Sequence, residues 1–99
     1  SLGLTDCHLD KAAAEVVGSI SNLKRLKLSR TGFDLVVAKG ISKSRSIENL
    51  EVSHLEAPPQ AFLLLGSMPL KILNLDETGI DDATRVALKR KLPDCKIQY

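Results

Sequence analysis

Leucine and isoleucine recur along this chain in a fixed spacing. The stretches LKRLKLSRTGF (residues 23–33) and LKILNLDETGI (residues 70–80) both place apolar residues at the first, fourth, sixth and last positions. Alternate side chains of a β-strand point to the same face, so the fourth and sixth positions share one side of a strand. The two stretches therefore predict two equivalent strands, each with one buried face.

The spacing L-x-x-L-x-L occurs in successive frames that begin at Leu23, Ile47, Leu70 and Leu92, so the starts lie 24, 23 and 22 residues apart. Residues 2–9 supply the second half of one more frame. A period of this length indicates a stack of repeating structural units. We expect parallel strands near residues 2–4, 26–28, 50–52, 73–75 and 95–97.

Between these strands the apolar period changes to three or four residues, which is typical of amphipathic helices. The helical stretches lie at residues 10–20, 34–41, 58–66 and 81–92. Asp10, Asp34 and Asp81 stand where a carboxylate can accept a hydrogen bond from a free backbone N–H at a helix start. Pro59 suits a first helical turn, because the donor that proline lacks is not needed there.

Matching places in the four helical stretches are apolar, so helices and strands should face one core. These places are held by Val17, Ile41, Leu65 and Leu88. The basic run at residues 89–91 ends the last stretch, where the helix dipole favours cations. We interpret the chain as one domain, with units at about residues 1–22, 23–46, 47–69 and 70–91 and a closing strand within residues 92–99.

The pattern resembles that of leucine-rich repeat proteins, L-x-x-L-x-L-x-x-N/C-x-L, over essentially the whole chain. The resemblance implies an α/β solenoid, a right-handed superhelix with short parallel strands on its concave face and short helices on its convex face. Leu55 departs from the pattern at the column where asparagine or cysteine usually satisfies backbone groups. Cys7, Thr31 and Thr78 fill this column in other units. We interpret Leu55 as drift in one unit, with a side-chain hydrogen bond missing from its turn.

Composition narrows the classes of partner. The 99 residues are 43% hydrophobic and only 3% aromatic, which leaves few flat rings for base stacking or ligand cages. A net charge of +2 is far from the concentrated basic field of a nucleic-acid-binding protein. No apolar run approaches the roughly 20 residues of a bilayer span. We therefore expect no nucleic-acid partner and no membrane partner.

The sequence carries no recognisable reaction motif, neither a glycine loop for phosphate nor a nucleophile elbow nor a zinc-binding helix. The stretch DCHLD (residues 6–10) gathers groups that can bind zinc. Cys7, however, belongs to the inward column, and His8 beside it should point away, so no closed ligand set forms. We expect no catalytic residues, no cofactor and no metal, and hence no enzyme.

The two cysteines are predicted to be unpaired. Cys7 belongs to the first strand unit and Cys95 to the last, which places them four strand spacings or roughly 19 Å apart. A disulfide needs Cα atoms within about 7 Å. Two free thiols, together with the absence of an N-x-S/T acceptor, favour an intracellular and cytoplasmic location.

The non-leucine columns should face away from the core, and they supply the candidate binding residues. The resemblance implies that the concave face recognises another protein. Two interpretations remain open: an electrostatically selective docking face, or a self-satisfied ladder that pairs Lys27 with Glu51 and Arg30 with Glu77. The column that contains Lys27 also contains Gly3, Asn74 and Lys96. The candidates are Lys27, Arg30, Glu51, His54, Asp76 and Glu77.

The expected function is a non-catalytic protein–protein interaction module, the C-terminal part of a longer array. We expect Ser1 to be a cut, because the chain opens within a strand frame and has no polar capping unit there. The alternative is a structural module that closes a larger array or self-associates through an open N-terminal strand edge. The identity of the protein partner does not follow from the sequence.

Overall fold

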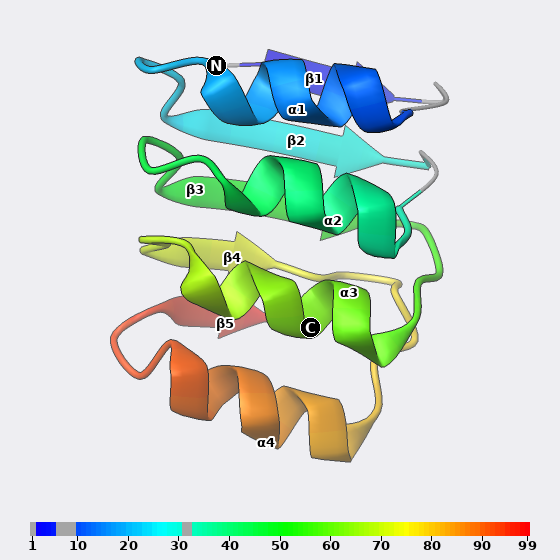
Figure 1. Ribbon diagram of the computed structural model, residues 1–99. Helices are drawn as coiled ribbons and strands as arrows, with labels where there is room; N and C mark the ends of the chain where they lie inside the picture. The colour runs from blue at the N-terminus through cyan, green and yellow to red at the C-terminus, as the bar shows by residue number, and fades with distance from the viewer. Residues whose placement is uncertain (1, 6–9, 31–32) are drawn as a thin grey trace.

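The computed structural model is α/β, with one parallel sheet whose strands alternate with helices (Figure 1). The structure describes residues 2–5, 10–30 and 33–99. Strand order in the sheet is strand order in the chain. Each strand of the described chain lies within one residue of its predicted stretch at both ends. The strands are β1 (Leu2–Thr5), β2 (Arg25–Ser29), β3 (Asn49–Ser53), β4 (Ile72–Asn74) and β5 (Lys96–Gln98).

All helices lie against the same side of the sheet (Figure 1). The opposite side of the sheet has no helix over it in the described part of the chain, and we call it the uncovered face. A short 3-10 helix, η1 (Leu65–Ser67), continues the third helix. The helices are α1 (Lys11–Ser19), α2 (Leu35–Ser42), α3 (Pro59–Leu64) and α4 (Asp82–Lys91).

The predicted helix caps are confirmed. Asp10, Asp34 and Asp81 each accept a hydrogen bond from the backbone N–H three residues later, at 2.8, 2.9 and 2.8 Å. Hydrogen bonding by Thr84, from its side chain and then its backbone, holds the pKa of Asp81 below the usual value. Pro59 occupies the first turn of α3. These local contacts explain why each helix starts where it does.

The strands pair in the register that the leucine spacing predicts, except at the last strand. Leu26 lies opposite Leu50, and Leu50 lies opposite Leu73. In β5, however, Ile97 lies opposite Leu73, so the prediction that Cys95 takes this place is wrong by two residues. The reason is a turn, closed by a hydrogen bond of 3.2 Å from the Cys95 backbone N–H to the carbonyl of residue 92. This turn delays the strand until residue 96.

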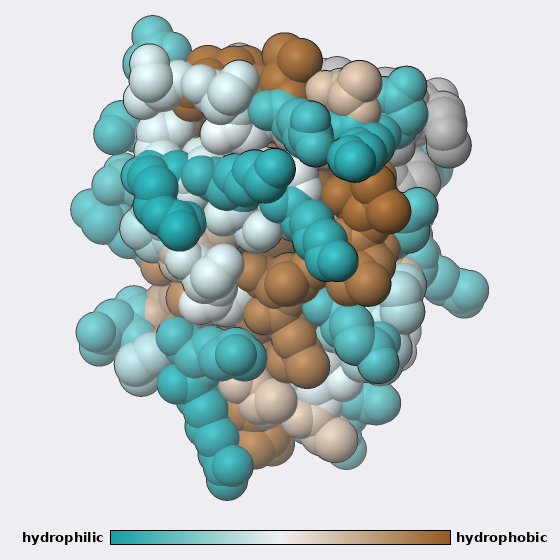
Figure 2. Space-filling view, viewed as in Figure 1, coloured by the Kyte–Doolittle hydropathy of each residue, from teal (hydrophilic) through white to brown (hydrophobic). Residues whose placement is uncertain are grey.

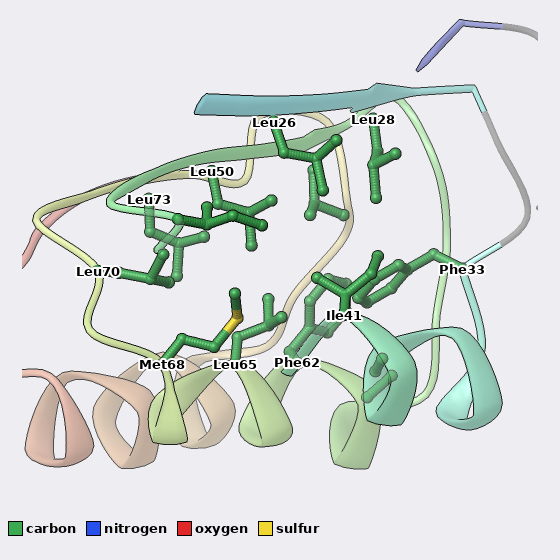
Figure 3. Packing of buried hydrophobic residues seen from close by; sticks show 14 of the residues in the cluster. Leu26, Leu28, Phe33, Ile41, Leu50, Phe62, Leu65, Met68, Leu70 and Leu73 are labelled. Atoms are coloured by element: carbon green, nitrogen blue, oxygen red, sulfur yellow. The ribbon is translucent and has the colours of Figure 1, made fainter. Parts of the chain in front are cut away.

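One apolar core fills the space between the sheet and the helices (Figure 3). The strand leucines point down toward the helix layer, and Met68 and Leu65 point up between them. Phe33 and Phe62 contact each other, with ring centroids 6.0 Å apart. The predicted helical column is buried at all of its positions, which are Val17, Ile41, Leu65 and Leu88.

Helices α1 and α2 approach each other closely because glycines lie at their contact. A Cβ atom on Gly18 would overlap the carbonyl oxygen of Gly40. A Cβ atom on Gly40 would lie 2.8 Å from the Cβ of Ala14, closer than real Cβ atoms come. The missing side chain, rather than backbone freedom, is therefore what this contact requires. The sequence analysis assigned these glycines no role.

We expect Gly40→Ala to lower the free energy of unfolding, because overpacking at so close a backbone contact costs up to about 3 kcal/mol. This cost exceeds the roughly 1 kcal/mol that alanine gains over glycine in helix propensity. Urea unfolding followed by circular dichroism measures this change. Gly3→Ala is the matched control, because a Cβ atom on Gly3 has nothing within 4 Å. Equal stability of Gly40→Ala and the unaltered chain would contradict the close helix contact.

Candidate functional site

The six candidate residues lie on the uncovered face of the sheet or in the turns at the ends of its strands. Lys27 belongs to β2 and Glu51 to β3, where alternation with the buried leucines turns both outward. Glu51 is half-buried and the other five are exposed. The remaining four follow strand ends and are Arg30, His54, Asp76 and Glu77.

Lys27 and Glu51 form the cross-strand pair that the self-satisfied interpretation requires. They lie directly opposite in the β2–β3 register, and Lys27 Nζ is 3.6 Å from Glu51 Oε2. The Ser53 hydroxyl donates to the same carboxylate oxygen at 3.0 Å. The Lys27 side chain is 58% exposed, so the pair contributes only about 0–1 kcal/mol. A partner carboxylate could therefore replace Glu51 at small cost.

The second expected pair, Arg30 with Glu77, is not among the ion pairs that the structure gives between described residues. Arg30 is nevertheless engaged in other interactions. Asp6, which stands one repeat of 24 residues before Arg30, lies outside the described residues. Between described residues, the ladder interpretation is thus supported at Lys27 and Glu51.

Arg30, His54 and Glu77 share a left-handed backbone, with φ of 52°, 54° and 59°. Each stands four residues after a leucine of the paired register, so the three turns are equivalent. The Arg30 N–H donates to the Ser53 carbonyl at 3.2 Å, and the His54 N–H donates to the Asp76 carbonyl at 3.0 Å. These backbone hydrogen bonds continue the pairing of neighbouring units beyond the ends of the strands. The left-handed turn therefore aligns three candidate side chains along one edge.

Asn74 and Gln98 extend the polar surface toward β5, and the sequence analysis did not select them. Asn74 Oδ1 accepts the Asp76 backbone N–H at 2.9 Å, and Asn74 Nδ2 lies 3.4 Å from Gln98 Oε1. The expectation that Lys96 lies in the column of Asn74 is wrong, because Gln98 lies opposite Asn74. The cause is the same two-residue shift of β5. The signal for Asn74 was available, since it alternates with the buried leucine of β4.

Ile72 is an apolar residue on the uncovered face that the sequence analysis also left out. It is 39% exposed and lies in register between Asn49 of β3 and Lys96 of β5, at the start of the strands. Alternation in β4 places it outward, where the neighbouring strands carry polar residues. Ile72 thus adds one apolar side chain to an otherwise polar part of the uncovered face.

The repeat column that contains Leu55 agrees with the prediction at its two described positions, Leu55 and Thr78. The Thr78 hydroxyl is buried and donates to the Leu75 carbonyl at 2.8 Å. Leu55 instead packs into the apolar core, so its turn has no side-chain hydrogen bond from this position. Cys7 and Thr31, the other members of the column, lie outside the described residues.

Cys95 is a free, buried thiol, as predicted. Burial raises the pKa of Cys95, and the nearby charge of Lys89 opposes this effect without cancelling it. A raised pKa keeps the sulfur as the unreactive thiol. Cys7 and His8 lie outside the described residues. Among the residues that are described, no group of three or more His, Cys, Asp or Glu could hold a metal ion.

A surface hollow of about 370 Å³ lies at α4, away from the candidate residues. The guanidinium of Arg85 stacks over the ring of Tyr99 there, with 4.6 Å from Cζ to the ring centroid. Val86 forms part of its wall. The hollow thus belongs to the end of the sheet stack, and it contains none of the six candidates.

Comparisons with protein families, with curated proteins and with solved structures give no match. Within the described ranges, no helix has the length and apolar character needed to cross a membrane.

The left-handed turns make a prediction about stability. His54→Gly should keep or raise the free energy of unfolding, because the left-handed conformation costs an L-residue roughly 1–2 kcal/mol and costs glycine almost nothing. His54→Val should lower it, because a β-branched side chain tolerates positive φ poorly. Thermal and urea unfolding of both variants measure the difference. A valine variant as stable as the glycine variant would contradict a left-handed His54.

Proposed function

We propose that this chain is a leucine-rich repeat module that recognises another protein through the uncovered face of its sheet. The observation that carries the proposal is the matched register, in which Leu26, Leu50 and Leu73 lie opposite one another. Such a register gives each unit the same outward positions on one continuous surface. The proposal includes the right-handed solenoid form that the sequence pattern implies, with the strands on its concave side.

The chemistry of this face supports a partner that carries complementary charges. Lys27 and Arg30 lie in and after β2, whereas Asp76 and Glu77 follow β4, so positive and negative groups occupy different parts of the face. Glu51 lies between them on β3. Separated charges of this kind select partners and accelerate their encounter more than they raise affinity.

We further propose a non-catalytic role inside the cell. The free thiol of Cys95 suits a reducing compartment, where unpaired cysteines persist. The groups of the candidate face are exposed or paired on the surface, as in the Lys27–Glu51 contact, which suits binding more than chemistry in a dry site. A location in a reducing compartment and a surface that suits binding are both consistent with a recognition module.

A charge swap tests the docking face against the self-satisfied ladder. The double variant Lys27→Glu/Glu51→Lys keeps the pair and the net charge but exchanges the two signs. If the face docks a partner by charge, the variant should slow association and change its salt dependence, while circular dichroism shows the same fold. Affinity capture with the unaltered chain, followed by association kinetics on a recovered protein, provides the measurement.

Lys11→Glu/Lys39→Glu is a control that changes exposed charges on the helix layer, and it should leave the association rate unchanged. Equal association by the charge-swap variant would remove Lys27 and Glu51 from the binding site. A control variant that loses binding in the same way would move the site to the helices.

One observation favours the alternative, self-association through the first strand. Among the described strands, β1 stands at the end of the sheet order and has β2 on one side. A strand edge with unpaired backbone groups can accept a second strand. This alternative would make the chain an assembly module rather than a receptor for a different protein.

Sedimentation velocity over a concentration series tests the assembly alternative. If β1 pairs between copies, the sedimentation coefficient should rise with protein concentration, and a proline at position 3 should abolish the rise because it removes a backbone donor. A coefficient that stays at the monomer value at every concentration would exclude assembly through β1.

A further inference from the structure

The parallel arrangement brings every segment that leads from a helix into the next strand to one edge of the molecule (Figure 1). These segments are residues 19–25, 42–49, 65–72 and 89–96, all of them described, and we call their surface the basic edge. They carry two, two, one and four lysines or arginines respectively, nine in all, against the two carboxylates Glu48 and Asp94. Hydrophilic side chains mark the same margin in Figure 2.

The opposite edge carries the other sign. Described residues between a strand and the next helix include the capping carboxylates Asp10, Asp34 and Asp81, and also Asp76 and Glu77. Although the net charge is only +2, positive groups collect at one edge of the fold and negative groups at the opposite edge. The sequence analysis judged the basic character from the net charge alone and missed this separation, because the edges form only when the units stack.

Helix dipoles account for part of the positive charge at the basic edge but leave an excess of cations. The helices α1 to α4 all end at this edge, and each contributes roughly half a negative charge there, about two charges together. The nine cations and two carboxylates of the basic edge leave seven net positive charges. This is about five more than the helix dipoles offset. Helix capping alone therefore does not explain the concentration of lysine and arginine.

Some of these cations form ion pairs with other described residues, and others form none with them. Lys43 pairs with Glu15 at 3.8 Å and Lys71 pairs with Glu48 at 3.5 Å, both between exposed groups. Such pairs contribute about 0–1 kcal/mol and exchange readily. The cations of residues 24 and 25 make no ion pair with a described residue. The edge thus presents cations that a negatively charged ligand can reach.

Two hollows along the basic edge show what kind of ligand fits. One, of about 180 Å³, is lined by Lys24 together with the amide of Asn49, the apolar side chain of Ile72 and the carboxylate of Glu48. The other, of about 350 Å³, is lined by Lys24 again, with further cations and serine hydroxyls such as Ser21. A phosphodiester backbone has no use for the apolar wall that Ile72 forms. A peptide can use the amide, the apolar wall and the cations together.

We propose that the basic edge binds an acidic segment of a partner protein. Carboxylates of the segment lie along Lys24, Arg25 and Lys71, and an apolar side chain of the segment contacts Ile72. The proposal does not depend on the function assigned to the uncovered face, because the charged residues that carry it differ from Lys27 and Glu51.

The test uses a fluorescein-labelled glutamate-rich peptide that contains one leucine, measured by fluorescence polarisation at about 0.15 M salt, where long-range attraction is screened. The intact chain should bind it, with affinity that falls as salt rises. Lys24→Glu/Arg25→Glu should lose affinity on the order of tenfold or more. The matched control Lys11→Glu/Lys39→Glu has the same change in net charge, lies outside the four segments of the basic edge and the two hollows described above, and should bind as the unaltered chain does.

Several results would overturn the proposal. These are no binding by the unaltered chain, equal binding by Lys24→Glu/Arg25→Glu, or equal binding of a peptide with glutamine in place of glutamate. Tighter binding of a random-sequence DNA duplex at the same salt would assign the edge to phosphodiesters instead. Lys24→Gln/Arg25→Gln should show the same loss to a smaller extent, which keeps the test valid if the reversed variant folds poorly. Lys27→Glu/Glu51→Lys should bind the probe normally, which separates this site from the Lys27–Glu51 pair of the uncovered face.

Discussion

The register of the parallel strands is the constraint on which the other features depend. Backbone hydrogen bonds hold Leu26, Leu50 and Leu73 opposite one another. A slip of a single residue would turn these leucines to solvent and the charged residues to the core, so burial strongly favours one register. This register decides at once which side chains form the core, which form the uncovered face and which loops share an edge.

The helix layer depends on the same repeat distance. Neighbouring strands lie about 4.8 Å apart, and an α-helix with its side chains is much wider than this distance. Successive helices therefore have to pack closely to stay above the strands they follow. Gly18, Gly40 and Ala14 let α1 and α2 come close at one such place. The same parallel order directs every helix C-terminus to one side, where lysine and arginine collect. Packing and surface charge therefore have a common origin in the topology.

The uncovered face and the basic edge differ in how many contacts within the chain fix their side chains. On the uncovered face, Lys27 and Glu51 are paired but exposed enough for a partner to compete, and His54 stands in a left-handed turn that its backbone hydrogen bond maintains. Backbone strain of this kind is retained where the surrounding structure compensates for it. The basic edge consists of loops whose cations are only partly satisfied. A rigid face and an adjacent charged edge can contact different parts of one partner.

The sequence by itself determined the features that depend on neighbours along the chain. Leucine alternation gave the strands, the three- and four-residue period gave the helices, and Asp10, Asp34 and Asp81 marked helix starts, because side-chain direction and capping act within a few residues. The exposure of five of the six candidate residues followed from their places in the non-leucine columns, and Glu51 is the half-buried exception. A local turn at residues 92–95 shifted β5. Tertiary structure alone decided the left-handed turns, the glycine contact and the charge of each edge. These depend on how segments more than 20 residues apart are placed in space, which no local pattern records.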